Sequence, residues 1–131
     1  MARRERPLSP FLIYRFDYTM LWSFAHRTSG MLLSLGSIPF AWWLLALARG
    51  PEEYTSVMRA FETLALRVLL LGVLFGFFFH LANGIRHLAW DCGLGFEKAQ
   101  ARASAWIVLT VAIVLTAWVA LAFWRRLGGM P

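Results

Sequence analysis

The stretch VLLLGVLFGFFFHLANGI, from Val68 to Ile85, contains no Asp, Glu, Lys or Arg and a single histidine, His80. Two further windows are equally free of these residues, Thr28 to Ala48 and Ala103 to Trp124, so that the uncharged runs are 18 to 22 residues long. Because a helix rises ~1.5 Å per residue, about 20 residues cross the ~30 Å hydrocarbon layer of a bilayer. We therefore predict an all-α membrane protein with three transmembrane helices.

The composition supports a membrane protein rather than a soluble domain. The chain has 131 residues, of which 60% are hydrophobic, and a soluble core of this size could not hide so large an apolar share. We predict one transmembrane domain over residues 1–131, with helices at about 18–47, 61–90 and 103–124 and a partly helical connector at 52–62. The single cysteine, Cys92, rules out an internal disulfide, an iron–sulfur cluster or a thiolate zinc site built from this chain alone.

The net charge of +6 does not indicate nucleic-acid binding, because the 13 basic residues lie mostly between or beside the apolar runs. Such a distribution is typical of membrane topology and of contact with lipid headgroups. If the N-terminus is cytoplasmic, eight of the 13 fall on the inner side, namely Arg3, Arg4, Arg6, Arg15, Arg27, Arg86, Lys98 and Arg102. This bias predicts a cytoplasmic N-terminus.

The second apolar helix carries a histidine and glycine face. His80 and His87 are seven residues apart, which places them within ~20° of each other and ~10.5 Å apart along the axis. Gly72, Gly76 and Gly84 fall on nearly the same stripe, which predicts close approach of either a flat macrocycle or another helix. This helix alone also allows an alternative to a cofactor site. The glycines could form a helix-contact surface, with the histidine hydrogen-bonded to a neighbouring helix.

The first apolar helix carries a second polar face. Ser23, Arg27, Gly30 and Ser34 share this face, and His26 lies ~60° away. Arg27 is near the membrane boundary but within the helix, where an unpaired guanidinium is costly. It therefore needs an anionic or strongly accepting partner.

The two helices run antiparallel, so that Arg86 and His87 reach the same boundary as His26 and Arg27. His80 is expected one and a half to two turns deeper, beneath a ring of two arginines and two histidines. A metal porphyrin has this polarity, because its iron binds a neutral imidazole and its carboxylates bind cations. His80 and His87 project side by side from one helix and cannot be trans ligands of one iron. His26 is expected to lie too close to the boundary, so the second ligand is expected from a partner helix.

Three motifs carry a resemblance to a known family. They are RPLSP at Arg6–Pro10, SFAHRTSG at Ser23–Gly30 and HLANGIRHLAWD at His80–Asp91. Over essentially its whole length the chain resembles the cytochrome b membrane-anchor subunits of succinate dehydrogenase (succinate:quinone oxidoreductase). Members often have histidine where this chain has Phe11.

The resemblance implies that His80 is an axial ligand of a haem b, with the other ligand supplied by a second small anchor subunit in a heterodimeric bundle. It implies that Ser23 and Arg27 line a ubiquinone site and that His26, Arg27 and His87 lie near the haem propionates. Arg86 is expected in the same propionate region as a member of the boundary ring. Electrons would pass from an iron–sulfur subunit, fed by a flavoprotein subunit, to ubiquinone.

Two further predictions concern proton transfer and the membrane in which the chain lies. His26 and Asp91 are titratable groups at the aqueous boundary that can relay protons, although Asp91 can equally be a helix-end residue. The chain has no flavin-binding glycine motif and too few cysteines for clusters, so it contains no centre for succinate oxidation. A bacterial cytoplasmic membrane is favoured over the mitochondrial inner membrane. The rival functions are a fumarate reductase anchor and a cofactor-free structural membrane protein.

Overall fold

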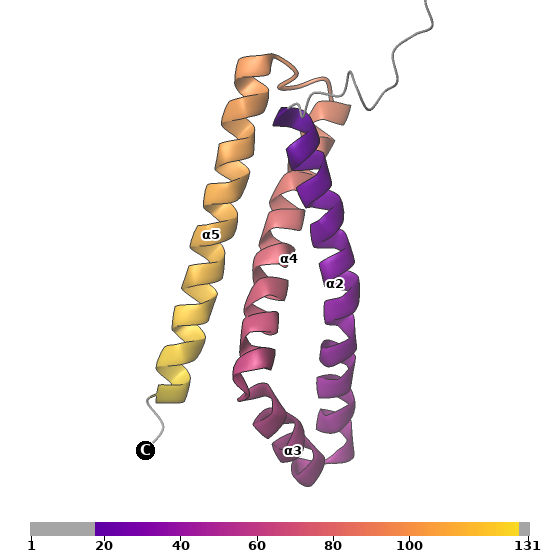
Figure 1. The fold of residues 1–131 in the computed structure, drawn as a ribbon, viewed down its shortest axis with the longest axis vertical. Helices are drawn as coiled ribbons and strands as arrows, with labels where there is room; N and C mark the ends of the chain where they lie inside the picture. Colours follow the sequence, from indigo (N-terminus) through magenta and orange to yellow (C-terminus); the bar gives the residue numbers. More distant parts are fainter. Residues whose placement is uncertain (1–17, 129–131) are drawn as a thin grey trace, which may run out of the picture.

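The structure, a computed structural model, describes residues 18–128. This part of the chain forms four helices, α2 (Tyr18–Arg49), α3 (Pro51–Phe61), α4 (Leu64–Asp91) and α5 (Lys98–Gly128) (Figure 1). The RPLSP motif at residues 6–10 and Phe11 lie outside the described residues.

The prediction of an all-α membrane protein with three spanning helices is confirmed. Within residues 18–128 there is no strand, and α2, α4 and α5 each contain a stretch long and apolar enough to cross a membrane. Most of their large apolar side chains stay exposed on the outside of the bundle. In a bilayer these side chains contact lipid, while the backbone polar groups are satisfied inside each helix.

The connector between the first two spans is the short amphipathic helix α3. Gly50 ends α2 with a φ of 116°, a conformation that favours glycine, and Pro51 starts α3 at a position where a missing N–H costs nothing. Glu52 and Glu53 occupy its first turn, where the helix dipole favours negative charge. Val57 is buried and anchors α3 to the bundle.

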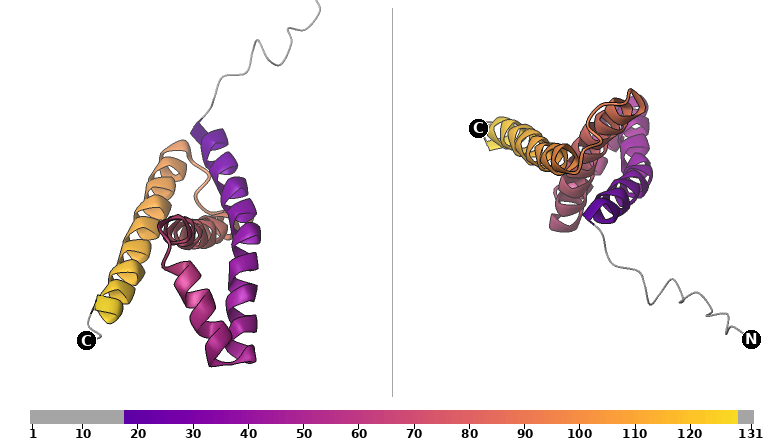
Figure 2. Two further views of the ribbon diagram at one scale, coloured as in Figure 1. Left: turned by 60° about the horizontal axis from the view of Figure 1, so that its bottom comes forward. Right: turned by 90° about the horizontal axis from the view of Figure 1, so that it is seen from above.

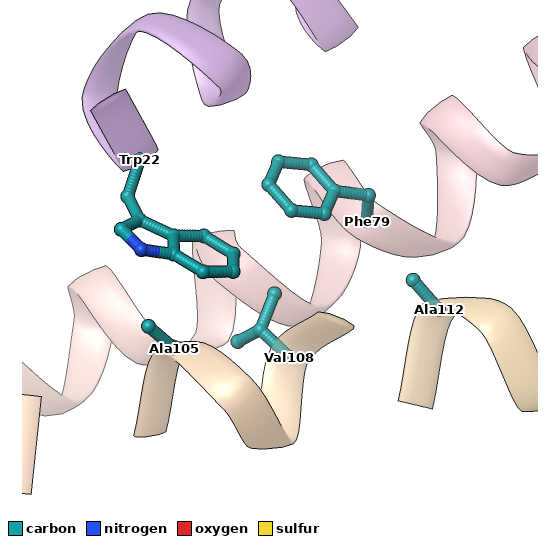
Figure 3. Packing of buried hydrophobic residues seen from close by; sticks show 5 residues of the cluster. All are labelled: Trp22, Phe79, Ala105, Val108 and Ala112. Carbon is teal, nitrogen blue, oxygen red and sulfur yellow. The ribbon is translucent and has the colours of Figure 1, made fainter. Parts of the chain in front are cut away.

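The helix α4 lies between the other two spans (Figures 1 and 2). The buried apolar cluster joins all three helices near the start of α2 and α5 and the end of α4, and consists of Trp22, Phe79, Ala105, Val108 and Ala112 (Figure 3). The rings of Trp22 and Phe79 stack with centroids 5.9 Å apart. The core therefore sits at the end of the bundle where the predicted histidines and arginines also lie.

Glycines set the distance between α2 and α4. A Cβ atom added at Gly36 would lie 2.6 Å from Cγ1 of Val73, and one added at Gly76 would lie 3.1 Å from Cδ2 of Leu32. On the glycine stripe predicted for α4, only Gly76 meets α2 in this way. Gly72 and Gly84 have open space beside them within the described chain.

We predict that Gly36→Ala lowers the thermal midpoint of the protein when it is purified in detergent together with the subunits that accompany it. Overpacking costs about 1–3 kcal/mol, which exceeds the roughly 1 kcal/mol that alanine gains over glycine in a helix. The double variant Gly36→Ala/Val73→Ala should recover part of the loss, since it removes the Cγ atoms that the new methyl meets. A midpoint for Gly36→Ala at or above that of the unmodified protein would contradict the close approach.

Candidate functional site

Three histidines meet where α2 packs against the end of α4. The His26 ring, from α2, stacks on the His80 ring with centroids 4.0 Å apart and planes 11° apart, and it lies 5.2 Å from the His87 ring. The structure thus brings together all three histidines of the chain. His26 is closer to His80 than expected, because the helix register sets His80 against the turn from His26 to Gly30.

One nitrogen of the His80 ring is held by α2. The hydroxyl oxygen of Ser29 lies 3.0 Å from His80 Nδ1, and the backbone oxygen of His26 lies 3.2 Å from the same atom. Within residues 18–128, Nε2 of His80 makes no hydrogen bond. His80 therefore has one engaged ring nitrogen and one available ring nitrogen.

Two neighbours of His80 come from α2: Ser29 was not selected from the sequence, and Gly30 was placed only on the polar face of the first apolar helix. Ser29 is buried, and Gly30 leaves room for the imidazole, since a Cβ there would lie 3.1 Å from His80 Cε1. Both belong to the SFAHRTSG motif. The signal that could have found Ser29 is its position three residues after His26, which allows its hydroxyl to reach the His26 carbonyl.

Ser23 and Arg27 are brought together as predicted from their shared helix face. Nη2 of Arg27 donates a hydrogen bond to the Ser23 hydroxyl oxygen over 3.3 Å, and the Arg27 side chain is exposed. No described carboxylate pairs with Arg27. The guanidinium therefore keeps most of its donors for a partner outside the described chain.

Arg86 is placed differently from the other ring members. Its guanidinium is buried and donates to the Ser104 hydroxyl (2.9 Å), to the Ala101 carbonyl (2.9 Å) and to Asn83 Oδ1 (3.2 Å). It also lies 4.0 Å from the ring centroid of Trp90. These contacts join α4 to the start of α5. Each guanidinium nitrogen of Arg86 already donates a hydrogen bond within the bundle, unlike those of Arg27.

Asp91 is exposed at the last position of α4. Among residues 18–128 it forms no contact with His26, so the structure does not join the two proposed relay groups directly. The same described residues contain no group of three or more His, Cys, Asp or Glu side chains that could hold a metal ion. Any metal bound at His80 thus needs ligands from elsewhere.

An apolar groove of about 570 Å³ lies beside the histidines. It is formed by α2, α4 and α5 and includes Trp22, Ser29, Phe79 and Trp106 in its wall. Its wall is almost wholly apolar, so it suits an apolar group better than a polar ligand.

Comparison with known proteins gives the family. Residues 2–119 match the family model described as "Succinate dehydrogenase/Fumarate reductase transmembrane subunit". The succinate dehydrogenase cytochrome b556 subunit of Rickettsia felis is 35% identical over 86% of this chain and 88% of the relative. The corresponding protein of Paracoccus denitrificans is 32% identical over the same shares.

A mitochondrial relative extends the comparison. The succinate dehydrogenase cytochrome b560 subunit of Sus scrofa is 35% identical over 84% of this chain and 67% of the relative. The bacterial relatives and the three apolar helices agree with a multi-pass protein of a bacterial membrane. The chain therefore belongs to the family of succinate dehydrogenase and fumarate reductase transmembrane subunits.

Proposed function

We propose that this membrane anchor binds haem b and ubiquinone and passes electrons from an iron–sulfur subunit to ubiquinone. The observation that carries the proposal is the setting of His80, whose Nδ1 is held by α2 while Nε2 makes no hydrogen bond within the described chain. Iron-ligating histidines commonly have one ring nitrogen on the metal and the other hydrogen-bonded to the protein. The donor set around His80 fits this role.

A companion anchor subunit would supply the second residue that holds the haem iron. His87 projects from the same helix as His80, the His26 ring stacks on the His80 ring, and residues 18–128 contain no group of three or more metal-binding side chains. The open space beside Gly72 and Gly84 supports a partner on this side, because helices in membranes approach each other closely over small residues. Haem b, when bound, would supply a site that accepts and returns one electron.

The propionates of the haem would be held by His26, Arg27 and His87. The two histidines lie within ring contact of each other, and Arg27 follows His26 directly in α2. Arg86 contributes to this arrangement indirectly in our proposal, because its donors already bind Asn83, Ser104 and Ala101. It holds α5 against α4 and so fixes the end of α4 that carries His87.

Ubiquinone would bind beside Ser23 and Arg27. The Ser23 hydroxyl accepts a hydrogen bond from Arg27, which leaves its own proton free to be donated to a quinone carbonyl oxygen. The Arg27 guanidinium would stabilise the negative charge that grows on that oxygen during reduction. His26 and Asp91 would deliver protons from the cytoplasmic side.

The partners follow from what the chain lacks. A flavoprotein subunit would oxidise succinate, and an iron–sulfur subunit docked on the cytoplasmic face would deliver the electrons. A fumarate reductase anchor is the alternative, since the family model covers both enzymes. The names of the bacterial and mitochondrial relatives favour succinate dehydrogenase.

We predict that His80→Leu removes or shifts the b-type absorption spectrum of the reduced complex, because it removes an axial ligand. The control is His87→Leu on the same face of α4, which should leave a low-spin haem in place. Difference spectra of the purified complex provide the measurement. Loss of haem in the His87 variant, with a normal spectrum in the His80 variant, would overturn the assignment.

We predict that Arg27→Leu lowers succinate-dependent ubiquinone reduction about 100-fold or more, the scale expected when a charge-stabilising donor is lost. Reduction of an artificial dye by the soluble subunits should persist, since those subunits are unchanged. Arg49→Leu, at the opposite end of the same helix, is the control and should reduce ubiquinone normally. A normal rate with Arg27→Leu would remove Arg27 from the quinone site.

We predict that the chain expressed without the other subunits accumulates poorly and incorporates little haem. Alone it would expose the open space beside Gly72 and Gly84 to lipid and would offer only His80 to hold a haem iron. Co-expression with the companion anchor should restore both accumulation and haem content. A stable, haem-loaded monomer with two axial histidines would contradict the heterodimeric bundle.

A further inference from the structure

The Ser29 hydroxyl bridges two groups of the histidine cluster. Its oxygen lies 2.7 Å from the backbone oxygen of His26 and 3.0 Å from Nδ1 of His80. A hydroxyl has one proton to donate, and a carbonyl oxygen can only accept. The Ser29 proton therefore goes to the His26 carbonyl, and a lone pair of the Ser29 oxygen faces His80 Nδ1.

The same carbonyl also faces His80. Nδ1 of His80 lies 3.2 Å from the backbone oxygen of His26, so both neighbours of this nitrogen act as acceptors. An unprotonated Nδ1 would set its lone pair against a carbonyl lone pair. The arrangement therefore requires the proton on Nδ1, and in a neutral imidazole this leaves the lone pair on Nε2.

The same turn of α2 also fixes the orientation of the His80 ring. The His26 ring stacks on one face of the His80 ring at 4.0 Å, and the missing side chain of Gly30 leaves the space next to Cε1. Ser29 is only 7% exposed, so water has little access to compete for its hydroxyl. One helical turn, His26 to Gly30, thus determines both the rotation and the tautomer of His80.

We infer that Ser29 is a positioning residue for His80: together with the His26 carbonyl, its hydroxyl holds the imidazole as the Nδ1–H tautomer with the Nε2 lone pair presented to a metal. This inference rests on the proposed role of His80 as a haem ligand. Acceptors on the far nitrogen make an imidazole a stronger electron donor. A stronger donor favours the oxidised iron, so the Ser29 hydroxyl would lower the reduction potential of a haem held by His80.

The test compares Ser29→Val with Ser29→Thr in the assembled complex. The two side chains have nearly the same shape, but only threonine keeps a hydroxyl. The midpoint potential of the haem, measured by optical redox titration, should shift to a more positive value in the valine variant and stay close to that of the unmodified complex in the threonine variant. The valine variant should also bind haem about 10-fold more weakly in reconstitution of the haem-depleted complex, the lower end of the loss seen when such partners are removed.

Ser37 offers a matched control on the same helix. Its hydroxyl donates to the carbonyl three residues earlier, that of Ser34, over the same 2.7 Å, but it makes no contact with a histidine. Ser37→Val should leave the midpoint potential unchanged. If Ser29→Val does not accumulate, the smaller Ser29→Ala takes its place in the same comparison with Ser29→Thr.

The outcomes separate this inference from the haem proposal. Equal midpoint potentials in the hydroxyl-free and hydroxyl-bearing Ser29 variants, with haem lost in His80→Leu, would overturn the role of Ser29 and leave His80 as a ligand. An unchanged haem spectrum in His80→Leu would overturn both. An equal shift in Ser37→Val would also overturn the inference, because the effect would then be a general response of α2.

Discussion

The close approach of α2 to α4 is the contact on which the other features depend. In a bilayer the hydrophobic effect does not press helices together, so association relies on packing and on interhelical hydrogen bonds. Gly30, Gly36 and Gly76 allow this packing, because a side chain at any of them would meet an atom of the facing helix. The resulting short distance lets His26 stack on His80 and lets Ser29 reach the same ring.

The helix α4 then serves two different polar sites from two of its faces. Towards α2 it presents His80, whose Nε2 makes no hydrogen bond within residues 18–128. Towards α5 it presents Arg86, whose guanidinium is satisfied by Ser104, Ala101 and Asn83. The two side chains therefore have different roles. The imidazole of His80 has a nitrogen that can bind a ligand, whereas the guanidinium of Arg86 has its hydrogen bonds inside the bundle and stabilises it.

The sequence predicts the fold well because hydrocarbon thickness sets the length of each helix. The three uncharged windows correspond to α2, α4 and α5, and the polar connector expected to be partly helical is α3. The nearness of His26 and His87 also follows from position along antiparallel helices, whereas the stacking of His26 on His80 is closer than the predicted difference in depth of one and a half to two turns. The contacts of Ser29 and Arg86 do not follow from position along the helices, because a helical wheel gives angles around one axis but not the rotation of one helix against another. For Arg86, a long side chain also leaves several acceptors within reach, and only the packed structure selects those on α5.

The hydrogen bonds of Arg86 also bear on how the chain is inserted during its synthesis. An arginine within a membrane helix opposes insertion, and two of the three acceptors that satisfy this one belong to α5. Those acceptors emerge from the ribosome after α4 has been made. The two hydrogen bonds from Arg86 to α5 can therefore form only after α5 has been made, so the pairing of these two helices comes late in synthesis.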